Sequence, residues 1–263
     1  MLGGDATQLI IADEPIGALL ARLRRASGDA TVAVGEPMIE LMLRSRREDG
    51  TAGLQVLALG AHSDDVEIGA GGTLARIAAE ISDVHARIVV LTSTPERASE
   101  ARAAGAALMA PGKVELDVHK LSDGRLPAHW DEVRDIFEEV ARTTSPDIIF
   151  APSPNDAHQD HRLVGSMVRT VFRDHLILQY EIPKWDGDLG SVRPTHYVPL
   201  TAEGMRRKTE LLRTFFPSQL GRDWFVDETF FGLARLRGME CRAHYAEAFS
   251  VDKAILALSS ERD

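Results

Sequence analysis

Apolar runs and helical patterns alternate from residue 54 onward, and this alternation limits the possible folds more than any other feature of the chain. The run "LQVLALG" at 54–60 is typical of a buried strand, and the segment 71–81 has helical spacing. The same two patterns recur until about residue 176, after which the pattern becomes mixed. Strands that alternate with helices form a parallel sheet with covered faces. The sequence therefore predicts an α/β protein with a doubly wound, mainly parallel sheet and helices on both faces.

The predicted elements divide the chain into two parts. Residues 1–53 carry helical patterns without strands, which predicts an N-terminal helical extension before a catalytic domain at 54–263. Within that domain we expect strands at 54–60, 86–93, 113–118 and 147–151, with further candidates at 176–182 and 195–200. We expect helices at 71–81, 95–109, 127–143, 161–175 and 202–215.

Two short polar motifs follow the first and the fourth of these strands. The first reads "AHSDD" at 61–65, and the second reads "HQDH" at 158–161. In a doubly wound sheet the fourth strand lies beside the first, and ligands bind in the crevice at the carboxyl ends of the strands. We therefore expect the two motifs to face each other.

Each motif alone is weak evidence, because Asp commonly caps helices and His is often structural. Together they indicate a metal site built from two His nitrogens and one carboxylate, with an open position for water. Such a set suits a catalytic zinc ion, with iron as the alternative. The i, i+3 spacing lets a turn aim His62 and Asp65 at one point. His158 and His161 share this spacing, but two ligands there would leave no histidine for proton transfer.

The two motifs resemble those of the PIG-L/LmbE-like N-acetyl-sugar deacetylases, which are zinc amidases with a Rossmann-like core. The first family motif is usually Ala-His-Pro-Asp-Asp, where this chain has Ser63 in place of Pro, and the second is His-x-Asp-His. The resemblance extends over about 54–250 and includes "LSDGRL", "YEIPKWDGDL" and "RGMECRAHYAEAF". Ser63 removes a fixed φ from the turn, but the ligand residues are unchanged.

The resemblance implies a role for each residue of the first motif and for the end of the second. His62, Asp65 and His161 are expected to bind one zinc ion per chain. Asp64 is expected to be the general base that deprotonates the zinc-bound water. This agrees with the chemistry of amide hydrolysis, in which zinc polarises the carbonyl and activates water while a carboxylate takes the proton.

The remaining motif residues are expected to stabilise the transition state of the reaction. The resemblance implies that His158 stabilises the tetrahedral oxyanion and that Asp160 orients and charges it. A cationic imidazole can meet the negative charge that develops on the carbonyl oxygen, and an aspartate partner would keep it cationic.

Three further residues are candidates for substrate binding. Arg97 lies at the carboxyl end of the second strand, where it could bind a sugar hydroxyl, although a surface pair with Glu100 would also explain it. Trp185 and Asp186 fall in the expected loop "EIPKWDGD", where Trp could stack on a sugar face and Asp could accept hydroxyls. The alternative for this pair is a packed loop without a binding role.

Composition argues against several partners and compartments. The net charge is −10 and the pI is about 5.4, so nucleic acid and anionic membranes are not expected partners. With one cysteine, Cys241, the chain cannot form an intrachain disulfide. No apolar run is long enough to span a bilayer, and we expect neither a signal peptide nor a location outside the cytoplasm. A homo-oligomer is possible.

The sequence thus predicts a zinc-dependent N-deacetylase acting on an N-acetylglucosamine-type sugar or glycoconjugate. One alternative is an amidase of a thiol conjugate, and another is a non-catalytic sugar-binding or assembly protein with a relict metal site. Asp64 favours an enzyme, because a protein without catalysis would not need a carboxylate base beside intact ligands. A dinucleotide site at "GAGG" (69–72) is rejected, since the glycine spacing does not fit and the preceding acidic residues would repel pyrophosphate.

Overall fold

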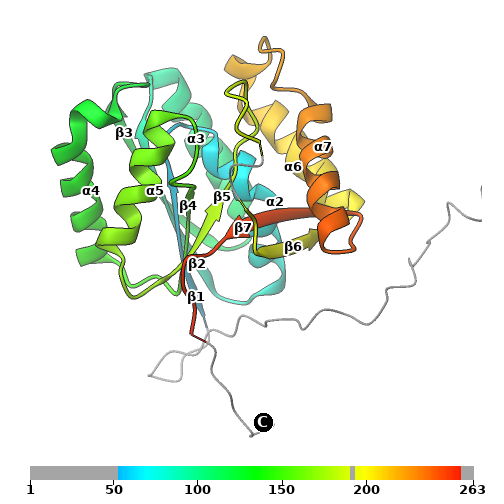
Figure 1. Ribbon diagram of the computed structural model, residues 1–263, viewed down its shortest axis with the longest axis horizontal. Helices are drawn as coiled ribbons and strands as arrows, with labels where there is room; N and C mark the ends of the chain where they lie inside the picture. The colour runs from blue at the N-terminus through cyan, green and yellow to red at the C-terminus, as the bar shows by residue number, and fades with distance from the viewer. Residues whose placement is uncertain (1–52, 190–192, 256–263) are drawn as a thin grey trace, which may run out of the picture. The chain divides into compact units, whose positions relative to one another are not determined.

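The computed structural model describes residues 53–189 and 193–255, so the expected N-terminal extension at 1–53 lies outside the described residues apart from Gly53. Figure 1 shows one sheet with helices on both faces. The strands are β1 (Leu54–Gly60), β2 (Val84–Thr92), β3 (Lys113–Leu121), β4 (Ile148–Pro152), β5 (Leu176–Tyr180), β6 (His196–Leu200) and β7 (Tyr245–Ser250). The α-helices are α2 (Asp65–Glu80), α3 (Pro95–Met109), α4 (Trp130–Thr143), α5 (Gln159–Val171), α6 (Ala202–Phe215) and α7 (Asp227–Glu240). Two short 3₁₀ turns are η1 (Leu126–His129) and η2 (Pro217–Gln219).

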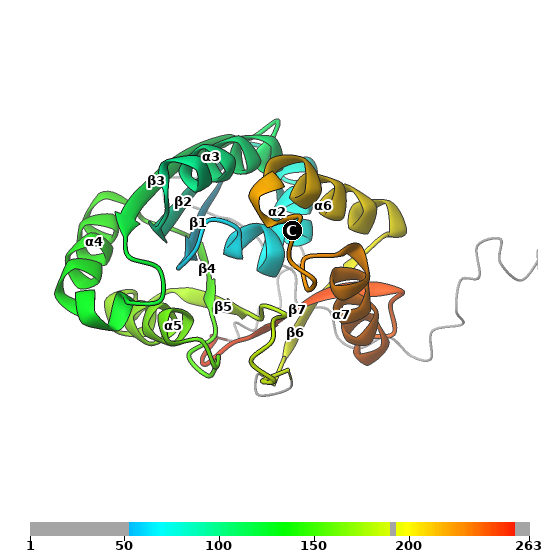
Figure 2. The same ribbon diagram turned by 90° about the horizontal axis from the view of Figure 1, so that it is seen from above.

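The sheet has the strand order expected of a doubly wound fold. Its order is β3-β2-β1-β4-β5-β7-β6, in which β1 to β5 pair in parallel and β7 pairs antiparallel with both β5 and β6. Helices α2, α3 and α6 pack together over one face, and α4 and α5 pack over the other, as Figure 2 shows from above. The Rossmann-like α/β fold is therefore confirmed, with the antiparallel last strand, β7, inserted between β5 and the edge strand β6.

Some element boundaries differ from the sequence prediction. Helix α2 begins at Asp65 and not at residue 71, because the glycines at 69, 71 and 72 lie inside the helix and not in a turn. Helix α5 begins at Gln159 and ends at Val171, so the expected range 161–175 was shifted. Neither α7 nor β7 was predicted. The buried residues of helix α7 are Phe230, Ala234, Arg237 and Gly238. Because this set mixes apolar, charged and small residues, the sequence shows no clear hydrophobic periodicity of a helix here.

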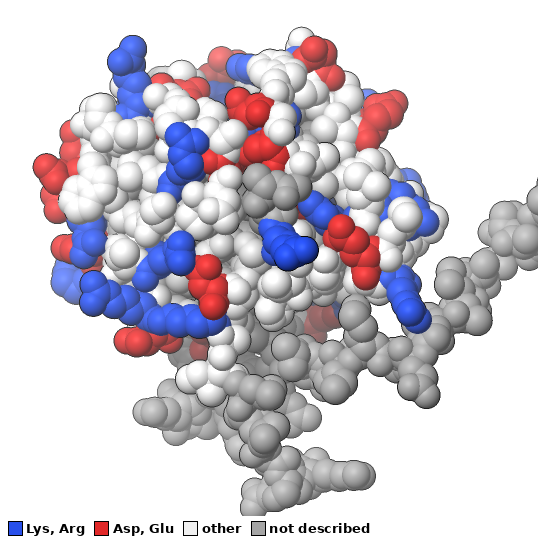
Figure 3. Space-filling view, in the orientation of Figure 1, with Lys and Arg blue, Asp and Glu red and all other residues white. Residues whose placement is uncertain are grey.

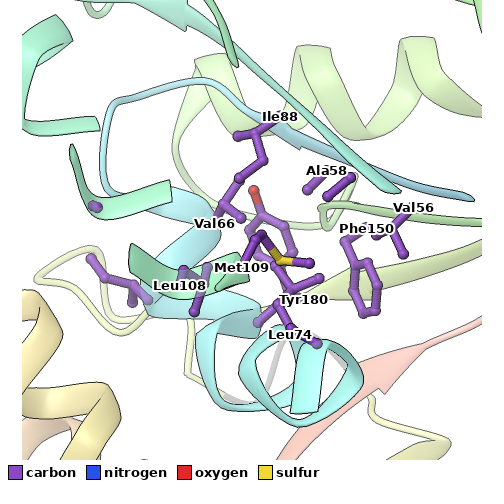
Figure 4. Packing of buried hydrophobic residues seen from close by; sticks show 14 of the residues in the cluster. Val56, Ala58, Val66, Leu74, Ile88, Leu108, Met109, Phe150 and Tyr180 are labelled. Carbon is purple, nitrogen blue, oxygen red and sulfur yellow. The ribbon is translucent and has the colours of Figure 1, made fainter. Parts of the chain in front are cut away.

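Tyr180 shows how closely α2 packs on the sheet. Its ring is fully buried in the core between the sheet and α2 (Figure 4), and its hydroxyl donates to the carbonyl of Leu59 at 2.6 Å. A Cβ added at Gly69 would lie 2.2 Å from the ring atom Cδ2 of Tyr180. A side chain at residue 69 would therefore force the helix away from β5.

We expect Gly69→Ala to lower the free energy of unfolding by about 1–3 kcal/mol, the usual cost of overpacking a core. Gly71→Ala on the same helix is the matched control, because the nearest atom to its added Cβ would be 3.8 Å away. That variant should be stabilised by up to about 1 kcal/mol, since alanine is the better helix former. Denaturant unfolding of both proteins measures the difference, and equal stabilities would contradict the packing described for Tyr180.

Two buried charges from the C-terminal part of the chain reach into α2. The carboxylate of Glu247 on β7 accepts hydrogen bonds from the backbone N–H groups of Gly72 (2.8 Å) and Thr73 (2.6 Å). Lys208 of α6 donates to the carbonyl of Ile68 at 2.6 Å and to Glu247 at 2.6 Å. Both charged side chains are buried, and each neutralises the other in a setting where an unpaired charge would be costly. Helix α2 is thus tied to the last strand and to α6.

The surface of the described residues carries both signs of charge. Figure 3 shows Lys and Arg interspersed with Asp and Glu on one face of the molecule. Among the described residues, no helix is both long and apolar enough to cross a membrane.

Candidate metal centre

The two polar motifs meet at the carboxyl ends of neighbouring strands. β1 and β4 are paired in parallel, with Ala58 opposite Phe150, so both chains leave the sheet at the same edge. The ring centroids of His62 and His161 then lie 5.0 Å apart. The expectation that these loops face each other is confirmed.

Three potential ligands converge at this edge. Nδ1 of His62 lies 3.1 Å from Nε2 of His161, which in turn lies 3.2 Å from Oδ1 of Asp65. The other carboxylate oxygen of Asp65, Oδ2, lies 3.5 Å from Nδ1 of His62. His161 and Asp65 are buried, whereas His62 is partly exposed, so the cluster is open on one side.

These separations fit a tetrahedral ion. Zinc–nitrogen and zinc–oxygen bonds of about 2.0–2.2 Å place neighbouring ligands of a tetrahedron about 3.3–3.5 Å apart. The His62–His161 distance of 3.1 Å and the 3.2 Å distance from His161 to Oδ1 of Asp65 lie near that value, whereas the 3.5 Å distance to His62 involves the other oxygen of Asp65. The donor set of two imidazoles and one carboxylate is also the one that leaves a fourth position free. The residues present therefore fit a divalent ion of this kind.

Each of the two candidate histidine ligands has a carboxylate on the other side of its ring. Nδ1 of His161 lies 3.0 Å from Oδ2 of Asp156, which is buried. Nε2 of His62 lies 3.0 Å from Asp123 and 3.4 Å from Asp160, close enough for charge attraction although neither oxygen completes a hydrogen bond. Such outer carboxylates fix the ring orientation of histidines that bind metals.

In the absence of a metal ion, the carboxylates around the cluster raise the pKa of both of these histidines. Burial lowers the pKa of His161, but the carboxylates of Asp65 and Asp156 outweigh it and raise that pKa to about 9. The pKa of His62 is also raised well above its usual value, because Asp65, Asp123 and Asp160 outweigh burial. The two imidazoles hold the pKa of Asp65 well below its ordinary value in spite of burial. A cation that binds at this site therefore displaces protons from the two histidines.

His158 adjoins the same cluster. Its ring centroid lies 4.8 Å from those of both His62 and His161, and one ring nitrogen from each of the three residues falls within 4.8 Å of the others. Burial, together with the positive charges of His161 and His62, lowers the pKa of His158. The carboxylate of Asp160 raises this pKa, but the nearby histidines and burial outweigh it, and the expected charging of His158 by Asp160 stays a prediction.

The carboxylate of Asp160 instead holds the segment after β3. It accepts hydrogen bonds from the backbone N–H groups of Gly124 at 2.7 Å and Leu126 at 3.0 Å. Its own N–H donates to Nδ1 of His158 at 3.3 Å, so the backbone of Asp160 and not its carboxylate is what contacts this ring. Asp160 thereby places Asp123, which was not predicted, at the edge of the cluster.

Asp64 has a different environment from its neighbour Asp65. It occupies the N-cap position of α2, but its side chain makes no capping hydrogen bond. Its Oδ1 accepts a hydrogen bond from Nη2 of Arg97 at 2.7 Å instead. Burial raises the pKa of Asp64, and Arg97 offsets part of this rise. The simple reading of Asp64 as a helix cap is therefore excluded.

Arg97 is held by more than the expected pair with Glu100. Its Nη1 lies 3.4 Å from Glu100 and 3.2 Å from the hydroxyl of Ser218, and its side chain is only 15% exposed. The guanidinium thus bridges Asp64 to η2. A direct substrate contact by Arg97 stays a prediction.

The other two predicted substrate residues lie on the loop after β5. Trp185 and Asp186 are both exposed, and Trp185 donates its indole N–H to Asp223 at 3.2 Å. Just before them, Lys184 lies 2.8 Å from Oδ1 of Asp156. Lys184 and Asp156 were not predicted. Asp156 lies two residues before the second motif. Only the folded structure, in which its carboxylate lies 3.0 Å from His161, shows that it adjoins the cluster.

We expect Asp156→Asn to weaken metal binding by about 10–100-fold, the usual cost of losing an outer partner of a histidine ligand. The physical reason is that His161 loses the carboxylate that orients its ring and raises its basicity. Asp188→Asn is the matched control, because Asp188 also binds Lys184 but was found to contact Ala157 and not His161. Competition of each protein with a metal-binding dye measures the affinity. Equal affinities of the two variants would contradict this role.

Comparison with known proteins finds a matching family and similar folds. Residues 57–172 match the PIG-L family, described as GlcNAc-PI de-N-acetylase. The N,N′-diacetylchitobiose deacetylase from Pyrococcus horikoshii is similar with a TM-score of 0.57 and 21% identity, covering 75% of this chain and 83% of that one. The 4-carboxy-2-hydroxymuconate hydratase GalB from Pseudomonas putida KT2440 gives 0.59 and 17%, covering 79% and 100%. The zinc-inhibited form of the teicoplanin deacetylase Orf2 gives 0.53 and 15%, covering 76% and 100%. At these identities the structures support the fold.

Proposed function

Because residues 57–172 match the PIG-L family, described as GlcNAc-PI de-N-acetylase, we propose that the chain is an amide hydrolase that removes the N-acetyl group from an N-acetylglucosamine-type sugar or glycoconjugate. The observation that carries this proposal is the convergence of His62, Asp65 and His161 beside Asp64. A ligand set and a separate carboxylate at one edge of the sheet are the two parts that hydrolysis of an amide requires.

We propose that the ligand set binds one zinc ion per chain, with ferrous iron as the alternative. When bound, such an ion polarises an amide carbonyl and makes water acidic enough to be activated near neutral pH. His62, Asp65 and His161 would hold it, and Asp156 would orient the ring of His161. The P. putida hydratase has a similar fold, so the fold alone does not decide the reaction.

In this proposal Asp64 takes a proton from the attacking water. Its carboxylate is fixed by Arg97, so one oxygen is held while the other is left to accept the proton. The side chain is only 5% exposed, which limits exchange of that proton with solvent. Arg97 acts here as a positioning residue.

His158 completes the reaction from the other motif. A neutral imidazole at this position donates an N–H to the carbonyl oxygen as negative charge develops there. The water adds to the amide carbon, the C–N bond breaks, and the amine leaves with the proton that Asp64 accepted. The products are acetate and the free amino sugar in equal amounts. Trp185 and Asp186 are proposed to contact the sugar from the loop after β5.

The test is acetate release by protein stripped with a chelator and restored with zinc or with ferrous iron. Acetate and primary amine should appear in a one-to-one ratio from an N-acetylglucosamine glycoside, and only after metal is restored. An N-acetylated cysteine conjugate of an amino sugar, assayed in parallel, tests the thiol-conjugate alternative. Metal-loaded protein that releases no acetate from either class would overturn the proposal and favour a relict site.

A further inference from the structure

The loops after β4 and β5 leave the sheet side by side. β4 and β5 are parallel neighbours, and their last paired residues are Pro152 and Tyr180. The loop after β4 comprises residues 153–158 and leads into the second motif. The loop after β5, which we call the β5 loop, comprises residues 183–189. Both loops therefore start from the edge of the sheet that carries the candidate metal centre.

Lys184 of the β5 loop lies between two carboxylates. Its Nζ is 2.8 Å from Oδ1 of Asp156 and 3.3 Å from Oδ2 of Asp188. Nζ also donates to the carbonyl of Ile182 at 3.4 Å. The side chain of Lys184 is only 10% exposed and that of Asp156 only 3%. Loss of one partner from such a buried pair leaves the other charge without compensation, whereas an exposed pair would contribute little.

The same two carboxylates hold the backbone of the loop after β4. Oδ1 of Asp156 accepts a hydrogen bond from the N–H of His158 at 2.7 Å. Oδ2 of Asp188 accepts one from the N–H of Ala157 at 2.7 Å. Lys184 therefore neutralises the two charges that bind two consecutive backbone groups. Because Lys184 and His158 both bind Oδ1 of Asp156, the orientation of this carboxylate is fixed and its Oδ2 is left for another partner.

The partner of Oδ2 of Asp156 is a proposed metal ligand. It lies 3.0 Å from Nδ1 of His161. The opposite ring nitrogen of His161, Nε2, faces Asp65 at 3.2 Å and His62 at 3.1 Å. Lys184, Asp156 and His161 thus form a continuous chain of polar contacts from the β5 loop to the cluster. All three side chains are largely buried, so water does not separate them.

The β5 loop presents its next two residues to solvent. Trp185 and Asp186 follow Lys184 directly, and both are exposed. The indole of Trp185 donates to Asp223, which lies on the side away from Asp156 in the chain of contacts. The side chain of Lys184 is therefore the link between these two exposed residues and the metal centre. A change at Asp156 or Lys184 alters the anchor on which Trp185 and Asp186 are placed.

We propose that Lys184 is a positioning residue of the metal centre and that it links occupation of the centre by a divalent ion to the order of the β5 loop. An ion that fixes the ring of His161 also fixes Asp156, and through it Lys184 and the loop. By linkage, a loop held in place by Lys184 favours binding of the ion by the same factor. This inference rests on the proposed metal site, and in it Lys184 acts through Asp156.

Cleavage of the full chain by chymotrypsin after Trp185 measures the order of the β5 loop, because proteolysis follows the population of the open form. We expect saturating zinc to slow this cleavage in the wild type by at least about fivefold, the lower end of typical coupling between sites. In Lys184→Gln cleavage should be fast with or without zinc. That variant keeps Trp185 and so controls for effects of zinc on the protease. Lys184→Arg, which keeps the charge, should restore the protection. Equal protection by zinc in wild type and Lys184→Gln would overturn the proposal.

Zinc affinity, measured by competition with a metal-binding dye, tests the route of the effect. Lys184→Gln should bind zinc at least about fivefold more weakly than the wild type, in line with the protection from cleavage. A purely electrostatic role predicts the opposite sign, because removal of a nearby positive charge favours a cation. In an Asp156→Asn background Lys184→Gln should have no further effect, since the route is already broken. Tighter zinc binding by Lys184→Gln, or an equal loss in both backgrounds, contradicts the proposal.

The outcomes separate this proposal from the proposed reaction, because neither cleavage nor zinc affinity depends on turnover. If zinc protects the β5 loop and Lys184→Gln removes the protection, but no N-acetylated sugar releases acetate, the reaction is wrong and the role of Lys184 stands. If acetate is released but zinc slows cleavage after Trp185 in neither protein, the role of Lys184 is wrong and the reaction stands. A wild-type chain that binds no divalent ion would overturn both.

Discussion

Asp64→Asn should retain bound metal while kcat falls by about 10²–10⁴-fold, the usual range for loss of a general base. Asparagine has nearly the same size as aspartate, and its carbonyl oxygen can still accept the 2.7 Å hydrogen bond from Arg97. What it cannot do is accept a proton from water. The side chain makes no capping hydrogen bond to α2, so the substitution removes no backbone partner from that helix.

Metal content and turnover are measured on the same purified preparation of Asp64→Asn. Glu100→Gln is a useful control, because Glu100 also contacts Arg97 but lies on its other side, where it binds Ser218. That variant should keep most of its turnover. An Asp64→Asn protein that is metal-free, or that turns over at nearly the wild-type rate, would show that Asp64 is not the base.

Asp65→Ala should weaken metal binding by more than the about 100-fold that loss of an outer partner can cost, because it removes a ligand. Its carboxylate approaches both imidazoles, at 3.2 Å from His161 and 3.5 Å from His62. Without it the two rings lose the one carboxylate that contacts both of them. Turnover should fall with metal content, and activity should not return at zinc concentrations that saturate the wild type.

His158→Ala decides between two ligand sets. The three histidines also bring one ring nitrogen each within 4.8 Å, so an ion bound by His62, His158 and His161 is the competing arrangement. If Asp65 is the third ligand, His158→Ala retains metal and loses rate. If His158→Ala is metal-free while Asp65→Ala still binds zinc tightly, the ligand assignment must be exchanged. Metal analysis of both variants after gel filtration distinguishes the two cases.

The place of the fourth strand beside the first and the meeting of the two motifs followed from sequence patterns alone. Both depend on a general rule, that parallel strands present their carboxyl ends at one edge, and this rule needs no knowledge of individual contacts. The same rule could have identified Asp123, which lies two residues after β3. It was missed because a single exposed aspartate in a loop has no partner at ligand spacing.

Other contacts of the site could not be read from the sequence. Lys184 reaches Asp156 from a different loop, and Arg97 reaches Asp64 across 33 positions of chain. The hydrogen bonds from Gly124 and Leu126 to Asp160 were not predicted, because proximity to His158 in the sequence does not say which way a carboxylate turns. The helix was expected to begin within "GAGG", at Gly71, and Gly69 and Gly72 pack in it against Tyr180 and Leu200.

The buried pair of Glu247 and Lys208 also affects the order in which this protein can mature during synthesis. Glu247 supplies acceptors to backbone groups of α2 that precede it by 175 and 174 positions. A nascent chain that has emerged only as far as α5 already contains both metal-binding motifs. It lacks the carboxylate that satisfies Gly72 and Thr73 and the ammonium that binds Ile68. Because Asp65 is the first residue of the same helix, we expect the candidate metal centre to reach its native geometry only after β7 has been synthesised.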